Sequence, residues 1–176
     1  IRGNYIGTNV TGSAAITGST AHGIRVLVAS GITIGGSAAG EGNLISGNGS
    51  AGIATEGTSS TVTIKGNNSG TNAAGSAAVA NGGGLSLGGS GHLLGGGSAG
   101  ARNLISGNAG DGVDLAGVQE VVRGNYIGVN GAGTAALGNG GFGIRGYGQV
   151  DGEIGGPAAA DGNVISGNGR SVSFEL

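Results

Sequence analysis

The chain has 176 residues, of which 47 are Gly, one is Pro and none is Cys, and its formal net charge is −2. Collagen needs Gly at every third position with abundant Pro, charge-driven disorder needs a high net charge, and a disulfide framework needs Cys, so these classes are excluded. A helical domain is disfavoured because each interior Gly costs a helix about 1 kcal/mol relative to Ala. The seven basic residues are spread singly, without the clustering typical of nucleic-acid binding.

A long internal repeat organises the chain as one domain over residues 1–176. The phrase Gly-Asn-Leu-Ile-Ser-Gly-Asn at 42–48 returns with small changes at 102–108 and 162–168. Self-similarity at a fixed period, here about 60 residues, is the signature of an architecture in which identical units stack on one another. Two further motifs keep a similar spacing: one begins at Ile34, Leu94 and Ile154, and the other at Gly3, Gly66 and Gly124.

Each unit of this repeat divides into two coils. Apolar residues that follow a Gly recur at nearly regular intervals, at Ile24, Ile53, Leu85, Val113 and Ile144. Between them, short apolar alternations such as 32–34 and 62–64 are bounded by Gly, Asn and Ser, which predicts strands of three to five residues. Three short strands per coil, in about six coils of roughly 30 residues, predict an all-β parallel β-helix.

Asn residues follow the same frame. An Asn at a turn tolerates a left-handed backbone, and Asn amides stacked on identical turns can hydrogen-bond along the column. We therefore expect structural ladders rather than catalytic groups. Twelve of the 15 Asn residues fall in three families: Asn43, Asn103 and Asn163; Asn48, Asn108 and Asn168; and the set Asn4, Asn9, Asn67, Asn72, Asn125 and Asn130.

These phrases, each followed by a Gly-Ile pair, resemble the right-handed parallel β-helix repeats of large bacterial secreted or cell-surface proteins, the superfold of pectate lyases. The resemblance implies a right-handed solenoid and an extracellular or cell-surface location. The same architecture serves polysaccharide-active enzymes, phage tailspikes, adhesins and stalks, so it leaves the function open. The chain opens inside a motif at residues 1–4, which indicates a piece of a longer protein. Residues 170–176 depart from the repeat, and we expect an irregular tail or a cap there.

Carboxylates are the first candidates for chemistry, because β-helix enzymes need them clustered for Ca²⁺ or for acid–base catalysis. Asp151 and Glu153 are two residues apart, so on a strand they face the same side. Asp111 and Asp114 lie in a segment that partly resembles a calcium-binding nonapeptide, which makes Ca²⁺ the one cofactor to consider. The alternative for both pairs is solvated turn carboxylates.

The basic residues form a clearer pattern. Arg2, Lys65 and Arg123 share one repeat position, so we expect a column on the outer wall at roughly 10 Å intervals. Such a column could contact an acidic polysaccharide. The alternative is that outward charges keep strand edges soluble. Arg25 and Arg145 share a second position, with Ser86 between them.

The remaining candidates are two His and three Tyr residues. His22 and His92 lie near neither a second His nor a carboxylate in the sequence, and no Ser–His–Asp set follows from the spacing. Tyr5 and Tyr126 recur at one position, with Asn68 between them. Aromatic rings there could stack on sugars or simply cover a turn.

Two functions remain. The first is a structural or adhesive segment, a rigid stalk or surface-binding module, because close self-similarity leaves little room for a unique catalytic set. Its partners would be polysaccharide or other surface material, further coils of the parent chain, or copies of itself joined through open ends. The second is a polysaccharide lyase, a glycoside hydrolase or a carbohydrate-binding β-helix. A lateral groove that gathers carboxylates, or a carboxylate with an Arg, would favour the enzyme.

Overall fold

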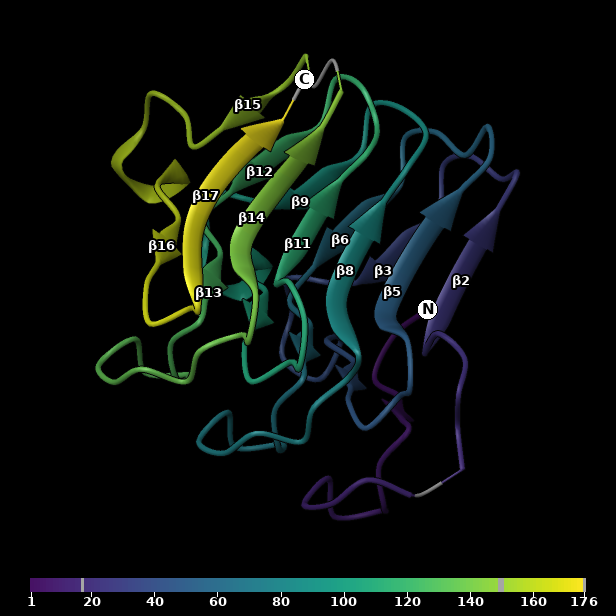
Figure 1. The fold of residues 1–176 in the computed structure, drawn as a ribbon, viewed down its shortest axis with the longest axis vertical. Coiled ribbons are helices and arrows are strands. Elements are labelled where there is room, and N and C mark those ends of the chain that lie inside the picture. Colours follow the sequence, from purple (N-terminus) through teal and green to yellow (C-terminus); the bar gives the residue numbers. More distant parts are fainter. Residues whose placement is uncertain (17, 149–150, 176) are drawn as a thin grey trace.

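The computed structural model describes residues 1–16, 18–148 and 151–175, and it is an all-β, right-handed parallel solenoid. Every complete coil contributes one strand to each of three parallel sheets, which we call A, B and C (Figure 1). Two single turns of 3-10 helix, η1 (Ala99–Ala101) and η2 (Ala159–Asp161), are the helical elements of the described chain. Among these residues, no helix is long and apolar enough to cross a membrane.

Sheet A has the shortest strands, because an Asn turn precedes each strand and, after the first strand, another follows it. Its strands are β1 (Tyr5–Ile6), β4 (Leu44–Ile45), β7 (Asn68–Ser69), β10 (Leu104–Ile105), β13 (Tyr126–Ile127) and β16 (Val164–Ile165).

Sheet B has the longest strands, and sheet C lies between sheet B and the return to sheet A. The strands of sheet B are β2 (Ile24–Leu27), β5 (Ala51–Glu56), β8 (Gly83–Leu87), β11 (Val113–Leu115), β14 (Phe142–Tyr147) and β17 (Arg170–Glu175). The strands of sheet C are β3 (Thr33–Gly35), β6 (Thr63–Lys65), β9 (Leu93–Gly95), β12 (Val121–Arg123) and β15 (Glu153–Ile154).

The register of sheet B confirms the coil length expected from the sequence. The apolar residues that follow Gly stand directly above one another, in the order Ile24, Ile53, Leu85, Val113 and Ile144. The 17 strands of the described residues make five complete turns and a sixth that has strands in sheets A and B, where the sequence predicts about six coils.

The last segment is more regular than expected. Residues 170–175 form strand β17, which pairs with β14 over its length and places Val172 above Ile144. Residues 170–175 are therefore not an irregular tail, and their role as a cap, the other alternative, stays a prediction. Leu176 lies outside the described residues. The Gly-Ile pair of earlier coils is absent here. The sheet nevertheless continues, because Val172 supplies a β-branched side chain at the position that Ile144 occupies one coil earlier.

A narrow core fills the bore of the solenoid. Each sheet contributes a row of fully buried aliphatic side chains, such as Ile45, Ile105 and Ile127 from sheet A. Stacked strands are about 4.8 Å apart, so each side chain contacts its equivalents in the coils above and below. Because the three rows meet across a small bore, Ile, Leu and Val suffice and large aromatic residues have no place inside.

Two Asn ladders hold the borders of sheet A. In each ladder, the side-chain oxygen of one Asn accepts both the main-chain N–H and the amide group of the Asn one coil earlier. The first ladder merges two of the expected families, as Asn4, Asn43, Asn67, Asn103, Asn125 and Asn163. The second ladder contains Asn48, Asn81, Asn108, Asn139 and Asn168, of which Asn81 and Asn139 belong to none of the expected families.

The other expected Asn positions stabilise loops. Asn9, Asn72 and Asn130 each accept a main-chain N–H from the residue four positions later, at 2.9 Å. They open three side loops, residues 8–15, 71–78 and 129–136, which protrude from alternate coils at the lower edge of the view (Figure 1). The loops also contact one another: the Ala73 N–H donates to the Gly12 carbonyl and the Gly131 N–H to the Gly75 carbonyl. The three loops are equal in length, so the length variation expected before Ile24, Leu85 and Ile144 lies in the segments that follow residues 15, 78 and 136.

Candidate functional site

The outer face of sheet A forms the floor of a groove that follows the solenoid axis. One side chain from each strand points outward in a single row: Tyr5, Leu44, Asn68, Leu104, Tyr126 and Val164. The groove extends over the first five of these residues. The following residue of each strand points into the core, as the two-residue period of a strand requires. The groove floor therefore consists of two aromatic rings at its ends, an amide in the middle and two Leu side chains between them.

Two walls rise beside this floor. The side loops form one wall, and their small residues, among them Ala73 and Gly75, lie close to the Leu side chains. The other wall consists of the turn segments 36–42 and 96–102, which join sheet C to sheet A. Both walls come from alternate coils, which is why the sequence repeats with every second coil rather than with every coil.

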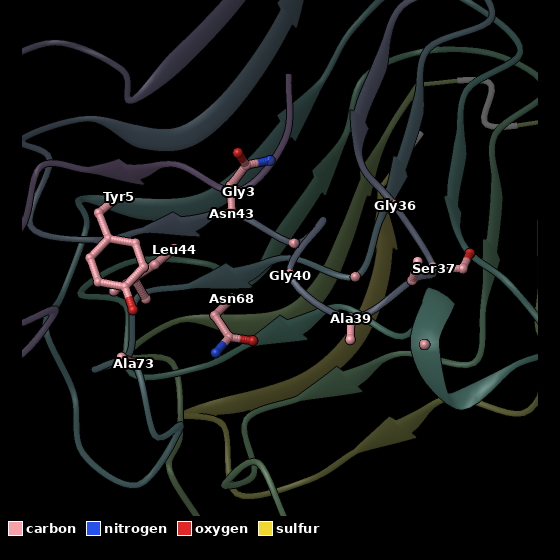
Figure 2. Close-up of a pocket in the computed structure, with 14 residues that line it drawn as sticks. Gly3, Tyr5, Gly36, Ser37, Ala39, Gly40, Asn43, Leu44, Asn68 and Ala73 are labelled. Atoms are coloured by element: carbon pink, nitrogen blue, oxygen red, sulfur yellow. The ribbon is translucent and has the colours of Figure 1, made fainter.

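The walls and floor enclose two neighbouring cavities that share Asn68. The larger measures about 630 Å³ and extends from Tyr5 past Asn68 to the turn at Gly100 (Figure 2). The smaller measures about 300 Å³ and extends from Asn68 to Tyr126 and Gly131. Figure 2 shows Tyr5, Leu44 and Asn68 facing the turn that carries Ser37 and Ala39. The two cavities form one groove over five coils, about 19 Å between the first and last floor strands.

The groove is nearly neutral. As far as the chain is described, the larger cavity is lined by Gly, Ala, Ser, Asn, Leu and Tyr, without an ionisable side chain other than Tyr5. The smaller cavity adds Arg102, whose guanidinium lies 4.0 Å from the centre of the Tyr126 ring and donates to the Gly124 carbonyl. Arg102 thus covers one face of Tyr126, whereas Tyr5 is half exposed.

The predicted carboxylates lie on other faces of the solenoid. Asp111 and Asp114 lie together on the outer face of sheet B, where Asp114 is the strand neighbour of Arg145. The Arg145 guanidinium is 3.9 Å from Asp111 and donates to Glu175 at 2.9 Å. Three carboxylates therefore surround one Arg, which meets part of the condition set for an enzyme.

The environment of Asp114 favours its protonated form. Burial, then the neighbouring Asp111 carboxylate, raises the pKa of Asp114 to about 6, against a smaller opposing effect of Arg145. One oxygen of Asp114 is shielded from water and has no hydrogen-bond partner among the described residues. Asp111 differs, because it accepts the Phe142 main-chain N–H. The two carboxylates therefore differ in their hydrogen-bond partners, and the raised pKa of Asp114 makes this residue the candidate acid.

Asp151 and Glu153 do not join this pair. Glu153 lies in β15 of sheet C, where it accepts a hydrogen bond from Arg123, and Asp151 is exposed. Within 1–16, 18–148 and 151–175, no group of three or more His, Asp or Glu side chains is spaced to hold a metal ion. The Ca²⁺ hypothesis for Asp111 and Asp114 stays a prediction.

Two of the three basic residues expected in one column share a register position. Lys65 and Arg123 occupy one register position of sheet C with Gly95 between them, and Arg2 precedes the equivalent Gly35. Gly95 has φ +89°, and a Cβ there would overlap the Arg123 carbonyl. Both Arg side chains are already paired, Arg2 with Glu41 and Arg123 with Glu153. Their use in binding an acidic polymer stays a prediction, and it would compete with these ion pairs.

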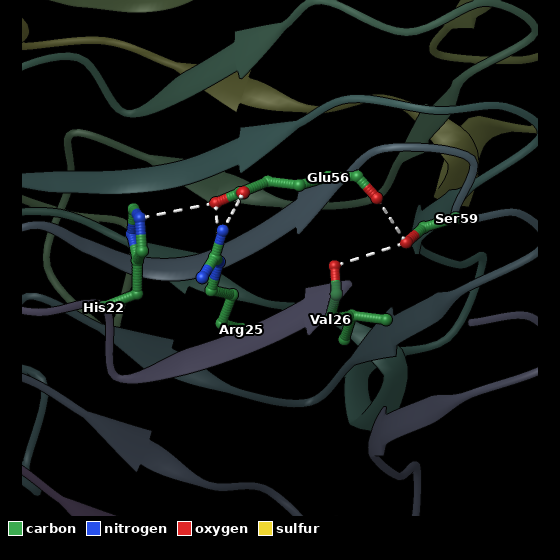
Figure 3. A network of polar contacts seen from close by, with 5 residues as sticks. All are labelled: His22, Arg25, Val26, Glu56 and Ser59. Atoms are coloured by element: carbon green, nitrogen blue, oxygen red, sulfur yellow. Dashed lines mark hydrogen bonds and ion pairs between the residues drawn. The ribbon is translucent and has the colours of Figure 1, made fainter. Parts of the chain in front are cut away.

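A polar network links the first two strands of sheet B (Figure 3). The Glu56 carboxylate accepts two hydrogen bonds from Arg25 and lies 3.5 Å from His22 Nε2. The Arg25 hydrogen bonds lower the pKa of Glu56. Ser59 Oγ is buried and lies near the main-chain carbonyls of Glu56 and Val26, away from His22. The network ties neighbouring strands together and provides no nucleophile beside the imidazole.

Sequence reasoning missed the groove and one buried ionisable group. The floor residues were visible only as Tyr5 and Tyr126 with Asn68 between them, since Leu44 and Leu104 belong to the other half of the repeat. Glu120 is buried in the core at the position one coil after His92, and this equivalence is the signal that could have identified it. Comparisons of the chain with family models, with curated proteins and with solved structures give no match.

Proposed function

We propose that this chain is a rigid, non-enzymatic binding module of an adhesive surface protein, and that it holds an extended polysaccharide in the groove of sheet A. The observation that carries the proposal is the groove over the row from Tyr5 to Tyr126, whose two cavities meet at Asn68 and whose lining, among the described residues, has Arg102 as its one charged side chain. An exposed aromatic face and an amide are groups that bind sugar rings and hydroxyls.

The repeat itself supports a polymer ligand. Groove walls recur every two coils, about 10 Å along the axis, so successive segments of a linear chain would meet similar surroundings. The near absence of charge favours a neutral polysaccharide over a uronate polymer. Two Asn ladders and a packed bore keep this surface rigid, which lowers the entropy lost on binding. An extracellular or cell-surface location is part of the proposal.

Affinity electrophoresis through gels that contain single polysaccharides tests the proposal. Neutral glucans, mannans and xylans should retard the protein, while polygalacturonate and alginate should retard it less. The same polymers are then incubated with the protein and assayed for reducing ends and unsaturated products. Retardation without product supports a binding module. Migration unaffected by every neutral polymer contradicts it.

The second candidate is a polysaccharide-active enzyme at the carboxylate pair of sheet B. The raised pKa of Asp114 beside Asp111 and Arg145 favours this alternative. In that case Asp114 would donate a proton and Asp111 would act as the base. The product assay decides between the two: products that form with the natural protein and vanish with Asp114→Asn would establish the enzyme and displace the first proposal.

A further inference from the structure

The corner between sheets B and C is built differently from the two corners beside sheet A. The Asn ladders stabilise the two corners beside sheet A. At the corner between sheets B and C, the equivalent positions of successive coils are instead occupied by Ile32, Val62, His92, Glu120 and Gly152. Amide ladders do not titrate. His and Glu do, so one of the three corners contains ionisable groups at the position where the others contain amides.

His92 and Glu120 repeat the ladder geometry of the Asn residues. The Val62 N–H donates to His92 Nδ1 at 3.1 Å, and the His92 N–H donates to Glu120 Oε2 at 3.1 Å. Each side chain thus accepts the main-chain N–H of the coil before it, as each Asn does. His92 Nε2 lies 3.0 Å from the Gly88 carbonyl, which assigns the imidazole proton to Nε2 and leaves Nδ1 as the acceptor.

Glu120 has one carboxyl oxygen without a partner. The His92 and Glu120 side chains are each only 1% exposed, and Oε1 of Glu120 has no hydrogen-bond partner among the described residues. Gly117 lies so close that a Cβ there would overlap Oε1, so the packing is tight around the oxygen. An ionised carboxylate here would place a charge in the bore with half of its acceptor capacity unused, which is costly.

No opposite charge offsets that cost within the described part of the chain. His92 faces Glu120 from the coil before, and Gly152 lies over it from the coil after. Asp151 beside Gly152 is exposed and acidic, and the Arg123–Glu153 ion pair lies on the outer face of sheet C. Burial raises the pKa of Glu120 to about 7, and the His92 N–H lowers it by less.

We propose that the His92–Glu120 step is a pH-sensitive latch: the protonated Glu120 keeps the corner between sheets B and C closed, and its ionisation loosens the contact between these two coils. This regulation is independent of what the groove binds. Protonation removes the charge from the enclosed Oε1, whereas ionisation favours an open form in which water reaches the carboxylate.

The direction of the effect follows from proton binding. The closed form holds its proton up to about pH 7, and a solvated Glu loses its proton near 4.5. Between these values the closed form binds more protons, so the latch is most stable below pH 4.5 and weakens as the pH rises toward 7. The opening equilibrium should rise by up to roughly tenfold per pH unit in this window and level off above it.

Hydrogen exchange followed by mass spectrometry tests the latch. Protection of peptides covering 88–93 and 116–121 is measured from pH 4.5 to 8 and corrected for the intrinsic pH dependence of exchange. The natural protein should lose protection as the pH rises to 7. Glu120→Gln keeps the shape and an acceptor for the His92 N–H but cannot ionise, so its corrected protection should stay constant. Glu153→Gln, an exposed change in the next coil, should follow the natural protein.

Two outcomes would overturn the proposal: constant protection in the natural protein, or a Glu120→Gln variant that loses protection in the same way. If Glu120→Gln does not fold, carbon-13 NMR of the side-chain carboxyl groups decides in the natural protein. A carboxyl resonance that titrates near pH 7 and belongs to Glu120 supports the latch. Titration of Glu120 near 4.5 contradicts it.

Discussion

Asn67 donates both its main-chain N–H and its side-chain amide to one atom, Oδ1 of Asn103, at 3.0 and 3.1 Å. The Asn103 amide in turn donates to the Ile64 carbonyl at 2.9 Å and to Asn125. A buried Asn that satisfies main-chain groups in two neighbouring coils replaces the hydrogen bonds of a sheet at a turn where the strands have ended. The ladder therefore fixes both the register of the coils and the position of the groove floor that follows it.

Asn103→Ala should destabilise the fold strongly. The change removes the acceptor of the buried Asn67 N–H and the amide that donates to the Ile64 carbonyl, while the Asn67 amide keeps its bonds to the Ile34 and Lys65 carbonyls. The buried groups that lose their partners cost about 2 kcal/mol or more. Urea unfolding measures the change in free energy. Asn72→Ala, which removes an exposed Asn of a side loop, is the matched control and should cost about 1 kcal/mol or less. Equal losses for the two variants would show that the ladder adds nothing beyond an ordinary turn.

Asn68→Arg should weaken polysaccharide binding at least tenfold without unfolding the protein. Asn68 is partly exposed and lies where the two cavities meet, so a long charged side chain there interrupts the groove. Ala116→Arg adds the same charge to the exposed outer side of sheet B and should bind as the natural protein does. Binding titrations with the retarding polymer give both affinities. If the Ala116 variant weakens binding as much, charge rather than groove occupation explains the loss.

The pH dependence of stability should show the opposite effects of Asp114 and Glu56. The pKa of Asp114 is raised from 3.8 to about 6, so its protonated form adds stability that is present below 3.8 and lost as the pH rises through 6. Asp114→Asn should therefore reduce the fall in thermal midpoint between pH 4 and 6. The pKa of Glu56 is lowered by Arg25, so its contribution is lost as the pH falls below its ordinary range. Melting curves of Asp114→Asn between pH 4 and 6, and of Glu56→Gln as the pH falls below 4.5, check both signs.

Ile105→Ala tests the account of the core. Ile105 is fully buried in the bore, and the coils on both sides fix its surroundings. The cavity that the smaller Ala side chain leaves therefore cannot close. Urea unfolding should show that the free energy of unfolding falls by about 2–5 kcal/mol. Val164→Ala, on the outer face of the last sheet A strand, should cost clearly less. A loss at Ile105 no larger than at Val164 would contradict a packed bore.

The fold follows from the sequence because its signals are repeated. Residues such as Ile53 and Leu85 recur at nearly fixed intervals beside Gly, and one inward position is enough to set the register of a whole sheet. Ladder membership was harder to predict. Asn81 and Asn139 belong to the half of the unit whose length varies. They follow Asn48 and Asn108 by 33 and 31 residues, so they do not recur at a fixed spacing in the sequence.

The candidate site could be predicted only in part. Tyr5 and Tyr126 recur visibly, but a groove depends on what rises beside the floor, and the Gly and Ala residues of the side loops carry no chemical signal of their own. The carboxylates were identified by residue type, which cannot tell that Glu153 would pair with Arg123 while Glu175 would join Asp111 around Arg145. These pairings arise from the register between strands of successive coils.

The most direct measurement is an amide NMR titration of the labelled protein with the neutral polysaccharide that retards it most. A groove-binding module predicts shift changes confined to the floor and walls, with the largest at Asn68, Ala73 and Gly75, and no release of reducing ends during the titration. Shift changes centred on Asp111, Asp114 and Arg145, or no shift change with any neutral polymer, would contradict a binding groove on sheet A.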